Sequence, residues 1–218
     1  ECEGRSVDFW NRLGGTGTVE HRRLLKISSG PVFAEFQVEL AYVDLSVPNG
    51  PEDAIAEEWT VRAFATPSGN LFAIESLQRC AGKSPLTLKE YHYGGMAARG
   101  AQGWYKDSDF DFLTSEGLTR QTGNHSRPDW VCMHGSVDGA PCSLTVFSHP
   151  SNFRSPQPVR LHPSMPYFVF SPPVLGEFQI TPEQPYRGRY LYFASDGAVD
   201  VERLKGIWSD YSQPPRVE

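Results

Sequence analysis

Residues 129–147, with the sequence DWVCMHGSVDGAPCSLTVF, carry the clearest structural signal in this chain. Two segments of strand length, 129–134 and 142–147, lie on either side of Asp138-Gly139. This dipeptide strongly favours the two-residue turn of a β-hairpin. The segment therefore predicts two antiparallel strands joined by a tight turn.

The hairpin turn determines which residues of the two strands face each other. A turn centred on Asp138-Gly139 places Cys132 opposite Thr145. It also places Cys142 opposite Gly135, so the two sulfur atoms are several residues out of register and too far apart for a disulfide. The four cysteines of the chain also lack the Cys-x-x-Cys spacing of a structural zinc site. We therefore expect reduced, mostly buried thiols.

Alternation with a period of two extends over much of the chain. Between Phe33 and Val47, polar and apolar side chains alternate, as in a strand with one solvated face. Similar segments are separated by turns rich in the 20 Gly and 18 Pro residues. The expected strands are 18–27, 33–47, 54–65, 70–80, 129–134, 142–147, 165–170 and 186–194. Many strands at short spacing predict an all-β fold, an antiparallel β-sandwich.

One segment near the end of the sequence has helical spacing. Asp200 is a typical N-cap residue, and apolar side chains recur every three to four positions from there to Trp208. We expect one C-terminal helix, packed on the sandwich. The sequence contains no internal repeat and no convincing linker, so a single domain over residues 1–218 is expected.

The composition narrows the functional classes. Of 218 residues, 39% are hydrophobic and 12% are aromatic, which excludes global disorder. The net charge is −6, and no basic stripe favours a nucleic acid or an anionic membrane as partner. No apolar run approaches the roughly 20 residues of a membrane-spanning helix. We expect a soluble protein without nucleic-acid or membrane partners, with the cytoplasm favoured over the periplasm or secretion.

A polar segment, Ser148-His149-Pro150-Ser151-Asn152, follows the second hairpin strand. Side chains at a strand end are held by the sheet and still reach solvent, which suits binding and catalytic groups. Alternation places His149 on the hairpin face that carries Trp130 and Phe147, and it predicts an aromatic-walled polar pocket there. The opposite hairpin face is apolar and is expected in the core. The alternative is that His149 caps the strand end by hydrogen bonding to backbone.

A second polar cluster lies upstream, in residues 89–99 (KEYHYGGMAAR). Alternation puts Glu90 and His92 on one side of this segment. Gly94-Gly95 allows a bulge or a close backbone approach, and Arg99 follows in a short strand. A carboxylate, an imidazole and a guanidinium near one another can supply a general acid or base. The alternative is a surface salt bridge between Glu90 and Arg99, which has little energetic value.

The six histidines do not form a metal-binding motif. None of them occurs as His-x-His or His-x-x-x-His, so a metal site would need ligands from distant strands. We therefore expect no metal and no other cofactor. The five tryptophans can stack on sugar faces, but most are expected in the core.

Several motifs occur in order along the chain and resemble those of a known family. They are Asp8-Phe9-Trp10, Lys89-Glu90 with Gly94-Gly95-Met96 and Arg99, Trp130, Phe147-Ser148-His149-Pro150-Ser151-Asn152, Arg160, and Tyr190 with Asp196-Gly197. Together they resemble a bacterial family of unknown function that is labelled PmoA-like or methane oxygenase PmoA. The resemblance covers nearly the whole chain, and its most specific elements are His-Pro-Ser-Asn and Gly-Gly-x-x-x-Arg.

The resemblance implies a β-supersandwich similar to galactose mutarotases. Such folds bind pyranosides in a concave sheet, with His as acid and Glu as base. Members of the family carry a His-His-Gly-type segment before the Asp-Phe-Trp element. Only seven residues precede Asp8 here, so we expect a chain that is truncated at its N-terminus and lacks this segment.

The main functional hypothesis is an enzyme that acts on a sugar or glycoside by acid–base chemistry. Epimerases, mutarotases and lyases all need this chemistry. Glu90 is the candidate base and His149 the candidate acid. The candidate substrate-binding residues are His92, Arg99, Trp130, Asn152 and Arg160.

Two alternatives remain open. The first is a non-catalytic carbohydrate-binding sandwich, in which Tyr93, Trp104 and Trp130 stack on the ligand. The second is a metal-dependent oxidoreductase, as the family label implies. A small carbohydrate is the expected partner in the first two cases, and the oligomeric state is not predicted.

Overall fold

The structure, a computed structural model, describes residues 1–105 and 110–214. The strands are β1 (Gly17–Ser29), β2 (Phe33–Asp44), β3 (Glu52–Phe64), β4 (Asn70–Cys80), β5 (Leu86–Leu88), β6 (Met96–Arg99), β7 (Asp111–Thr114), β8 (Trp130–Val137), β9 (Ala140–Ser148), β10 (Val159–Leu161), β11 (Tyr167–Phe170), β12 (Phe178–Ile180) and β13 (Tyr186–Asp196). The helices are η1 (Arg12–Gly14), η2 (Gln102–Tyr105) and η3 (Pro172–Leu175), which are 3-10 turns, and α1 (Val201–Ser212).

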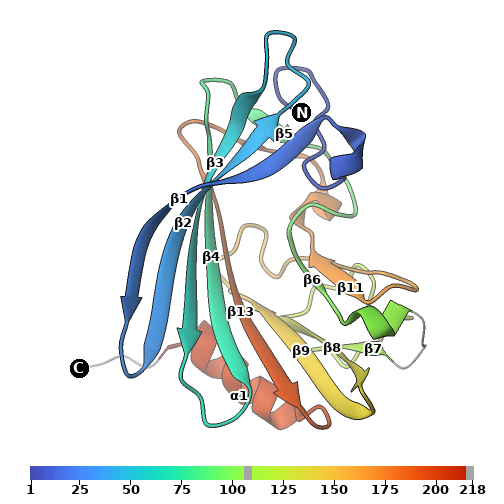
Figure 1. Ribbon diagram of the computed structural model, residues 1–218. Helices are drawn as coiled ribbons and strands as arrows, with labels where there is room; N and C mark the ends of the chain where they lie inside the picture. Colours follow the sequence, from blue (N-terminus) through green and yellow to red (C-terminus); the bar gives the residue numbers. More distant parts are fainter. Residues whose placement is uncertain (106–109, 215–218) are drawn as a thin grey trace.

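A strongly curved sheet of eight strands forms the framework (Figure 1). Its strand order is β1-β2-β3-β4-β13-β9-β8-β7, and neighbouring strands are antiparallel. A small sheet, β10-β11-β6, lies over one face of it, and a two-stranded sheet, β12-β5, lies near one end. This arrangement confirms an all-β antiparallel sandwich with one C-terminal α-helix in the described residues.

The β8–β9 hairpin has the predicted register. Cys132 pairs with Thr145, and Cys142 pairs with Gly135. At its tip, Asp138 and the glycine after it have φ angles of 53° and 78°, the left-handed values that this type of two-residue turn requires. All four cysteines are free thiols, as expected, but only Cys132 is buried, so the expectation of mostly buried thiols is wrong. Cys2, Cys80 and Cys142 are partly exposed.

The inner face of the large sheet packs against the small sheet. On the hairpin, Val131, Met133 and Val146 are buried in this core. Phe168 and Phe170 of β11 reach it from the small sheet. Because side chains alternate along each strand, this face takes every second hairpin residue, as the sequence predicted.

The other face of the hairpin is covered by α1. Trp130 is only 2% exposed, and it shares a core with Phe147 and with Leu204 of the helix. The expected open pocket on this face is therefore wrong, because the C-terminal helix fills the space that a ligand would need. The sequence predicted the C-terminal helix and the hairpin face of Trp130 and Phe147, but it did not predict that the helix covers this face.

The C-terminal helix begins as predicted and runs further than expected. The carboxylate of Asp200 accepts a hydrogen bond from the backbone N–H of Arg203 at 3.0 Å, as an N-cap does. The helix continues past Trp208 to Ser212. The eight expected strands are present with shifted ends, whereas β5, β7, β10 and β12, of three or four residues each, were not predicted as strands.

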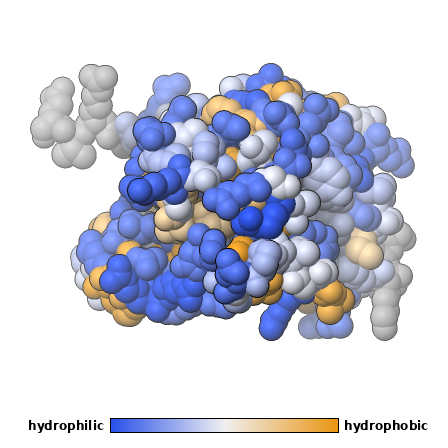
Figure 2. All heavy atoms as spheres, turned by 90° about the horizontal axis from the view of Figure 1, so that it is seen from above, coloured by the Kyte–Doolittle hydropathy of each residue, from blue (hydrophilic) through white to orange (hydrophobic). Residues whose placement is uncertain are grey.

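The surface is mostly hydrophilic, with small and separated hydrophobic patches in the view from above (Figure 2). None of the helices among the described residues has the length and hydropathy that crossing a membrane requires.

Candidate functional site

The small sheet has one apolar face and one polar face. Ala98 of β6 and Phe168 of β11 are paired and point into the core. One residue along, Arg99 pairs with Tyr167 on the opposite face. Arg160 of β10 pairs with Val169, two residues after Tyr167, and therefore projects to the same side as Arg99. The strand pairing thus places two arginines on the same face of the small sheet, one on each side of β11.

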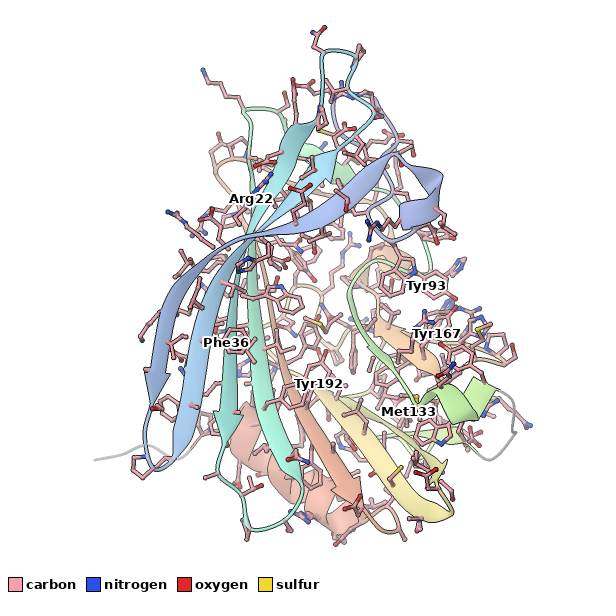
Figure 3. The ribbon with its side chains drawn as sticks, viewed as in Figure 1. Arg22, Phe36, Tyr93, Met133, Tyr167 and Tyr192 are labelled. Atoms are coloured by element: carbon pink, nitrogen blue, oxygen red, sulfur yellow. The ribbon has the colours of Figure 1, made fainter. Side chains whose placement is uncertain are left out.

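The loop before β6 adds a second tyrosine to this face. The hydroxyl oxygens of Tyr93 and Tyr167 lie 3.3 Å apart, within hydrogen-bonding distance. Figure 3 shows both side chains on the side of the molecule that carries the small sheet. We call the five residues His92, Tyr93, Arg99, Arg160 and Tyr167 the tyrosine–arginine cluster. It unites three of the seven residues that the sequence analysis selected.

Each arginine of the tyrosine–arginine cluster stacks on a tyrosine ring. The guanidinium carbon of Arg99 lies 4.9 Å from the ring centre of Tyr167, and Arg99 also donates a hydrogen bond to the hydroxyl of Tyr105. The guanidinium carbon of Arg160 lies 5.8 Å from the ring centre of Tyr93. Cation–π contacts of this kind hold the guanidinium planes in place and leave N–H groups available to a ligand.

Arg160 has further polar contacts. Its Nη1 donates to Asn124 Oδ1 at 3.1 Å and to the backbone oxygen of Leu161 at 3.2 Å. Its Nε is buried and has no hydrogen-bond partner in the described part of the chain. A guanidinium N–H that is neither solvated nor paired is costly, and such groups mark places where a partner is missing.

The glycine pair before β6 permits the close approach that the sequence predicted. A Cβ atom on Gly95 would lie 1.9 Å from the backbone oxygen of Phe170. Gly94 has a φ of +120°, a value that other residues rarely adopt. The chain therefore passes directly against the end of β11, and this contact positions Tyr93 over the small sheet.

Burial and neighbouring charges tune the titratable groups. The pKa of His92 is lowered below its ordinary value, mainly by desolvation and to a smaller extent by the positive charges of Arg160 and His125. Desolvation and the hydrogen bond with Tyr93 raise the pKa of Tyr167 to about 12. At neutral pH His92 is therefore mostly neutral and can accept a proton, and the phenol of Tyr167 is a hydrogen-bond donor.

Glu90 lies in the same loop, two residues before His92. Its side chain is exposed and makes no hydrogen bond or ion pair with another described residue. The alternative of a Glu90–Arg99 salt bridge is therefore not realised, since Arg99 contacts Tyr105 and Tyr167 instead.

The two other polar residues selected at the hairpin end have structural partners. His149 Nδ1 accepts a hydrogen bond from the backbone N–H of Ser151 at 3.0 Å, and its ring packs edge-on against Tyr211 of α1. The buried amide of Asn152 bonds to the backbone N–H and C=O of Arg189 at 2.8 Å each. The Asn152 bonds tie the loop after β9 to β13. The bond from Ser151 N–H to His149 is the backbone-capping alternative considered for His149.

The structure does not bring Glu90 and His149 into contact. His149 packs on the helix side of the large sheet, whereas the backbone next to Glu90 bonds to η3, where Tyr91 N–H meets Pro173 O at 3.4 Å. Trp130 and Trp104 are also buried, and the indole N–H of Trp104 donates to Ser136 O. Neither indole presents a face to a ligand.

Two histidines that the sequence analysis did not select stand beside the tyrosine–arginine cluster. The ring of His162 lies 4.5 Å from that of Tyr167, and its Nδ1 accepts a hydrogen bond from Met165 N–H at 2.8 Å. His125 has a φ of 65° in the loop that precedes β8. Their proximity depends on β10 pairing with β11, and nothing in their local sequence indicates it.

Two other polar regions of the large sheet lack the features of this site. A groove of about 430 Å³ on the outer face of the large sheet is lined mainly by charged residues that already pair with each other, among them Glu35 with Arg62 and Lys26. On the inner face, Glu57 is 2% exposed and bonds to Ser76 and Gln78, and its other oxygen is unpaired but closed off from solvent. Neither region combines open access with unpaired donors.

No group of three or more His, Cys, Asp or Glu side chains is placed to hold a metal ion among residues 1–105 and 110–214. The chemistry that the tyrosine–arginine cluster offers is hydrogen bonding, stacking and proton transfer.

The fold is a β-sandwich, and its small sheet carries an aromatic and cationic cluster of side chains, the candidate site. The chain belongs to DUF6807, a family of unknown function, whose model matches residues 3–209. No curated protein and no solved structure matches the chain significantly.

Proposed function

We propose that the tyrosine–arginine cluster binds a sugar or glycoside and that the protein acts on it by acid–base chemistry, as an epimerase, a mutarotase or a lyase. The observation that carries this proposal is the Tyr93–Tyr167 hydroxyl pair with an arginine stacked on each ring. A pyranose has an apolar face of C–H groups and a rim of hydroxyls. Half-buried tyrosine rings suit the former, and phenol and guanidinium N–H groups suit the latter.

In this proposal Glu90 is the base, and the ligand lies on the outer surface of the tyrosine–arginine cluster, against the rings of Tyr93 and Tyr167. Glu90 is exposed, so its carboxylate is free to reach a bound ligand. Tyr167, whose pKa is raised to about 12, serves as a proton donor or hydrogen-bond donor to a ligand oxygen. His149 has a structural role at the end of β9 because its ring nitrogen and its ring edge are already engaged.

A non-catalytic carbohydrate-binding protein is the second candidate. It is favoured by one observation, that Glu90 contacts neither His92 nor Arg99, so no acid–base pair is preassembled. The PmoA-like resemblance also implies a metal-dependent oxidoreductase, and copper or iron bound in stoichiometric amount to the purified protein would favour it.

The proposal is tested by thermal unfolding of the chain with a panel of monosaccharides, glycosides, keto-sugars and divalent metals. A sugar at about 100 times its Kd adds roughly 2.7 kcal/mol to the free energy of unfolding. Tyr167→Ala should abolish this shift, because it removes both the ring and the hydroxyl. No shift with any sugar contradicts the proposal.

For a sugar that binds, Glu90→Gln decides between the two candidates. Loss of turnover with retained binding supports the acid–base enzyme, whereas full turnover in this variant excludes Glu90 as the base. Glu183→Gln, which changes another exposed glutamate in the turn before β13, is the matched control and should leave turnover unchanged.

A further inference from the structure

Arg99 and Arg160 differ from the arginines of the large sheet in how their charge is balanced. Arg23 and Arg62, for example, pair with Glu39 and Glu35 across adjacent strands. Arg99 and Arg160 have no carboxylate within ion-pair distance among the residues that the structure describes. Their partners are tyrosine rings, a phenol, an amide oxygen and a backbone oxygen, none of which carries a full negative charge.

The two guanidinium groups are held on the same side of the small sheet with donors to spare. The Nη2 group of Arg160 makes no hydrogen bond with another described residue, because both of the side-chain hydrogen bonds of Arg160 use Nη1. Arg99 is exposed, and its recorded hydrogen bond uses one of five N–H groups. Planar guanidinium forks match the two oxygens of a carboxylate or phosphate, and such charge-assisted hydrogen bonds are about twice as strong as neutral ones.

The positive charges of the arginines also lower the pKa of the histidines in and beside the tyrosine–arginine cluster. Desolvation lowers the pKa of His162, and Arg160, Arg120 and Arg99 lower it further. The pKa of His92 is lowered in the same way by burial and by Arg160. Of these arginines only Arg120 has a nearby described carboxylate, Asp111 at 3.7 Å.

We propose that the sugar bound at the tyrosine–arginine cluster carries an anionic group, a carboxylate or a phosphate, which Arg99 and Arg160 hold together. This inference rests on the proposed function and specifies its substrate class. The tyrosine rings contact the sugar, and the arginines supply the charge that the described residues do not neutralise. Neutral sugars should bind more weakly because the two charges then stay unpaired.

The test is calorimetric titration of the full chain with glucose, glucuronate and glucose 6-phosphate at low and high salt. The expected result is binding of one anionic sugar about tenfold tighter than glucose, with a preference that shrinks as salt rises. Whichever anionic sugar binds tighter identifies the group as carboxylate or phosphate.

Single-residue variants test whether Arg99 and Arg160 cause the preference for an anionic sugar. Arg99→Gln and Arg160→Gln should each remove most of the preference, so that the anionic sugar binds about as weakly as glucose does to the same variant. Arg23→Gln, which removes an arginine of the large sheet, is the matched control and should change nothing. If a variant is unstable, the salt dependence of the native chain still tests the charge.

The outcomes separate the two proposals. Equal affinity for glucose and both anionic sugars overturns the anionic substrate class while the proposed function stands. An equal loss of preference in Arg23→Gln also overturns it, because the effect is then one of net charge. If none of the three sugars binds and the neutral panel of the unfolding test also fails, the proposed function falls as well.

Discussion

The hydroxyl oxygens of Tyr93 and Tyr167 lie 3.3 Å apart, although 74 residues separate them in the sequence. Tyr93 belongs to the loop before β6, and Tyr167 opens β11. Their contact closes this loop over the polar face of the small sheet, beside Arg99 and Arg160. The candidate site therefore depends on three segments that meet only in the folded chain.

Gly95→Ala should destabilise the fold and disturb the site. The added Cβ would lie 1.9 Å from the oxygen of Phe170, so β6 or β11 must move. We expect a loss of at least about 2 kcal/mol in the free energy of unfolding, measured by urea denaturation. Gly103→Ala is the matched control, since a Cβ there meets nothing within 4 Å. Equal stability of the two variants would contradict the close approach.

His149→Ala separates a structural from a catalytic role for this residue. The change removes the acceptor for Ser151 N–H and the edge contact with Tyr211. We expect a loss of about 1–2 kcal/mol of stability, with ligand affinity and turnover retained. A variant of native stability that has lost turnover would instead return His149 to the catalytic role that its sequence context predicted.

Stability should fall as the pH drops below about 6.5. Desolvation, with Arg189 or Arg160 nearby in some cases, lowers the pKa of His92, His134, His149 and His162 in the folded state. A group whose pKa is lowered by folding contributes stability that is fully present above its unfolded pKa of about 6.5. That contribution is lost as the pH falls toward the folded pKa.

Urea denaturation at pH 7.5, 6.5 and 5.5 measures this dependence. This pH range lies above the pH at which Glu35 and Asp44 become protonated, because their hydrogen-bond partners lower the pKa of both carboxyl groups. His134→Gln should flatten part of the decline, because burial is the main cause of its lowered pKa and Asp111 offsets it only in part. A stability that rises between pH 7.5 and 5.5 would show the sign to be wrong.

Asp200→Ala should loosen the C-terminal helix. It removes the side-chain acceptor of one of the free backbone N–H groups in the first turn, that of Arg203, and should cost about 1 kcal/mol of stability. Asp200→Asn keeps an acceptor oxygen and serves as the control. Hydrogen exchange across α1 should quicken in the first variant and not in the second. Unchanged exchange in both would mean that packing alone holds the helix.

Local patterns in the sequence predicted the large sheet and the helix well. The turn at Asp138-Gly139 determined the register of Cys132 with Thr145, because a two-residue hairpin leaves no freedom in pairing. The N-cap at Asp200 was likewise a local hydrogen bond. Such features depend on residues a few positions apart, which is why a sequence pattern reveals them.

The candidate site was predicted only in part because its pairing is non-local. β11 and β6 were expected as strands, but β10 has only three residues, too few for a period-two pattern to stand out. His92, Arg99 and Arg160 were selected for their chemistry, but their meeting point depends on β11 lying between β6 and β10. The helix that buries Trp130 is a second non-local contact, and it removed the pocket expected beside His149.

The most direct test of the account is an NMR titration that follows the imidazole C–H resonances while glucuronate or glucose 6-phosphate, whichever binds tighter, is added. His92 belongs to the tyrosine–arginine cluster and His162 lies beside it, whereas His134 lies on β8 and His149 packs on α1. The account predicts saturable shifts of the His92 and His162 resonances, with those of His134 and His149 unmoved. Shifts confined to His134 or His149, or none at all, would contradict a ligand site on the small sheet.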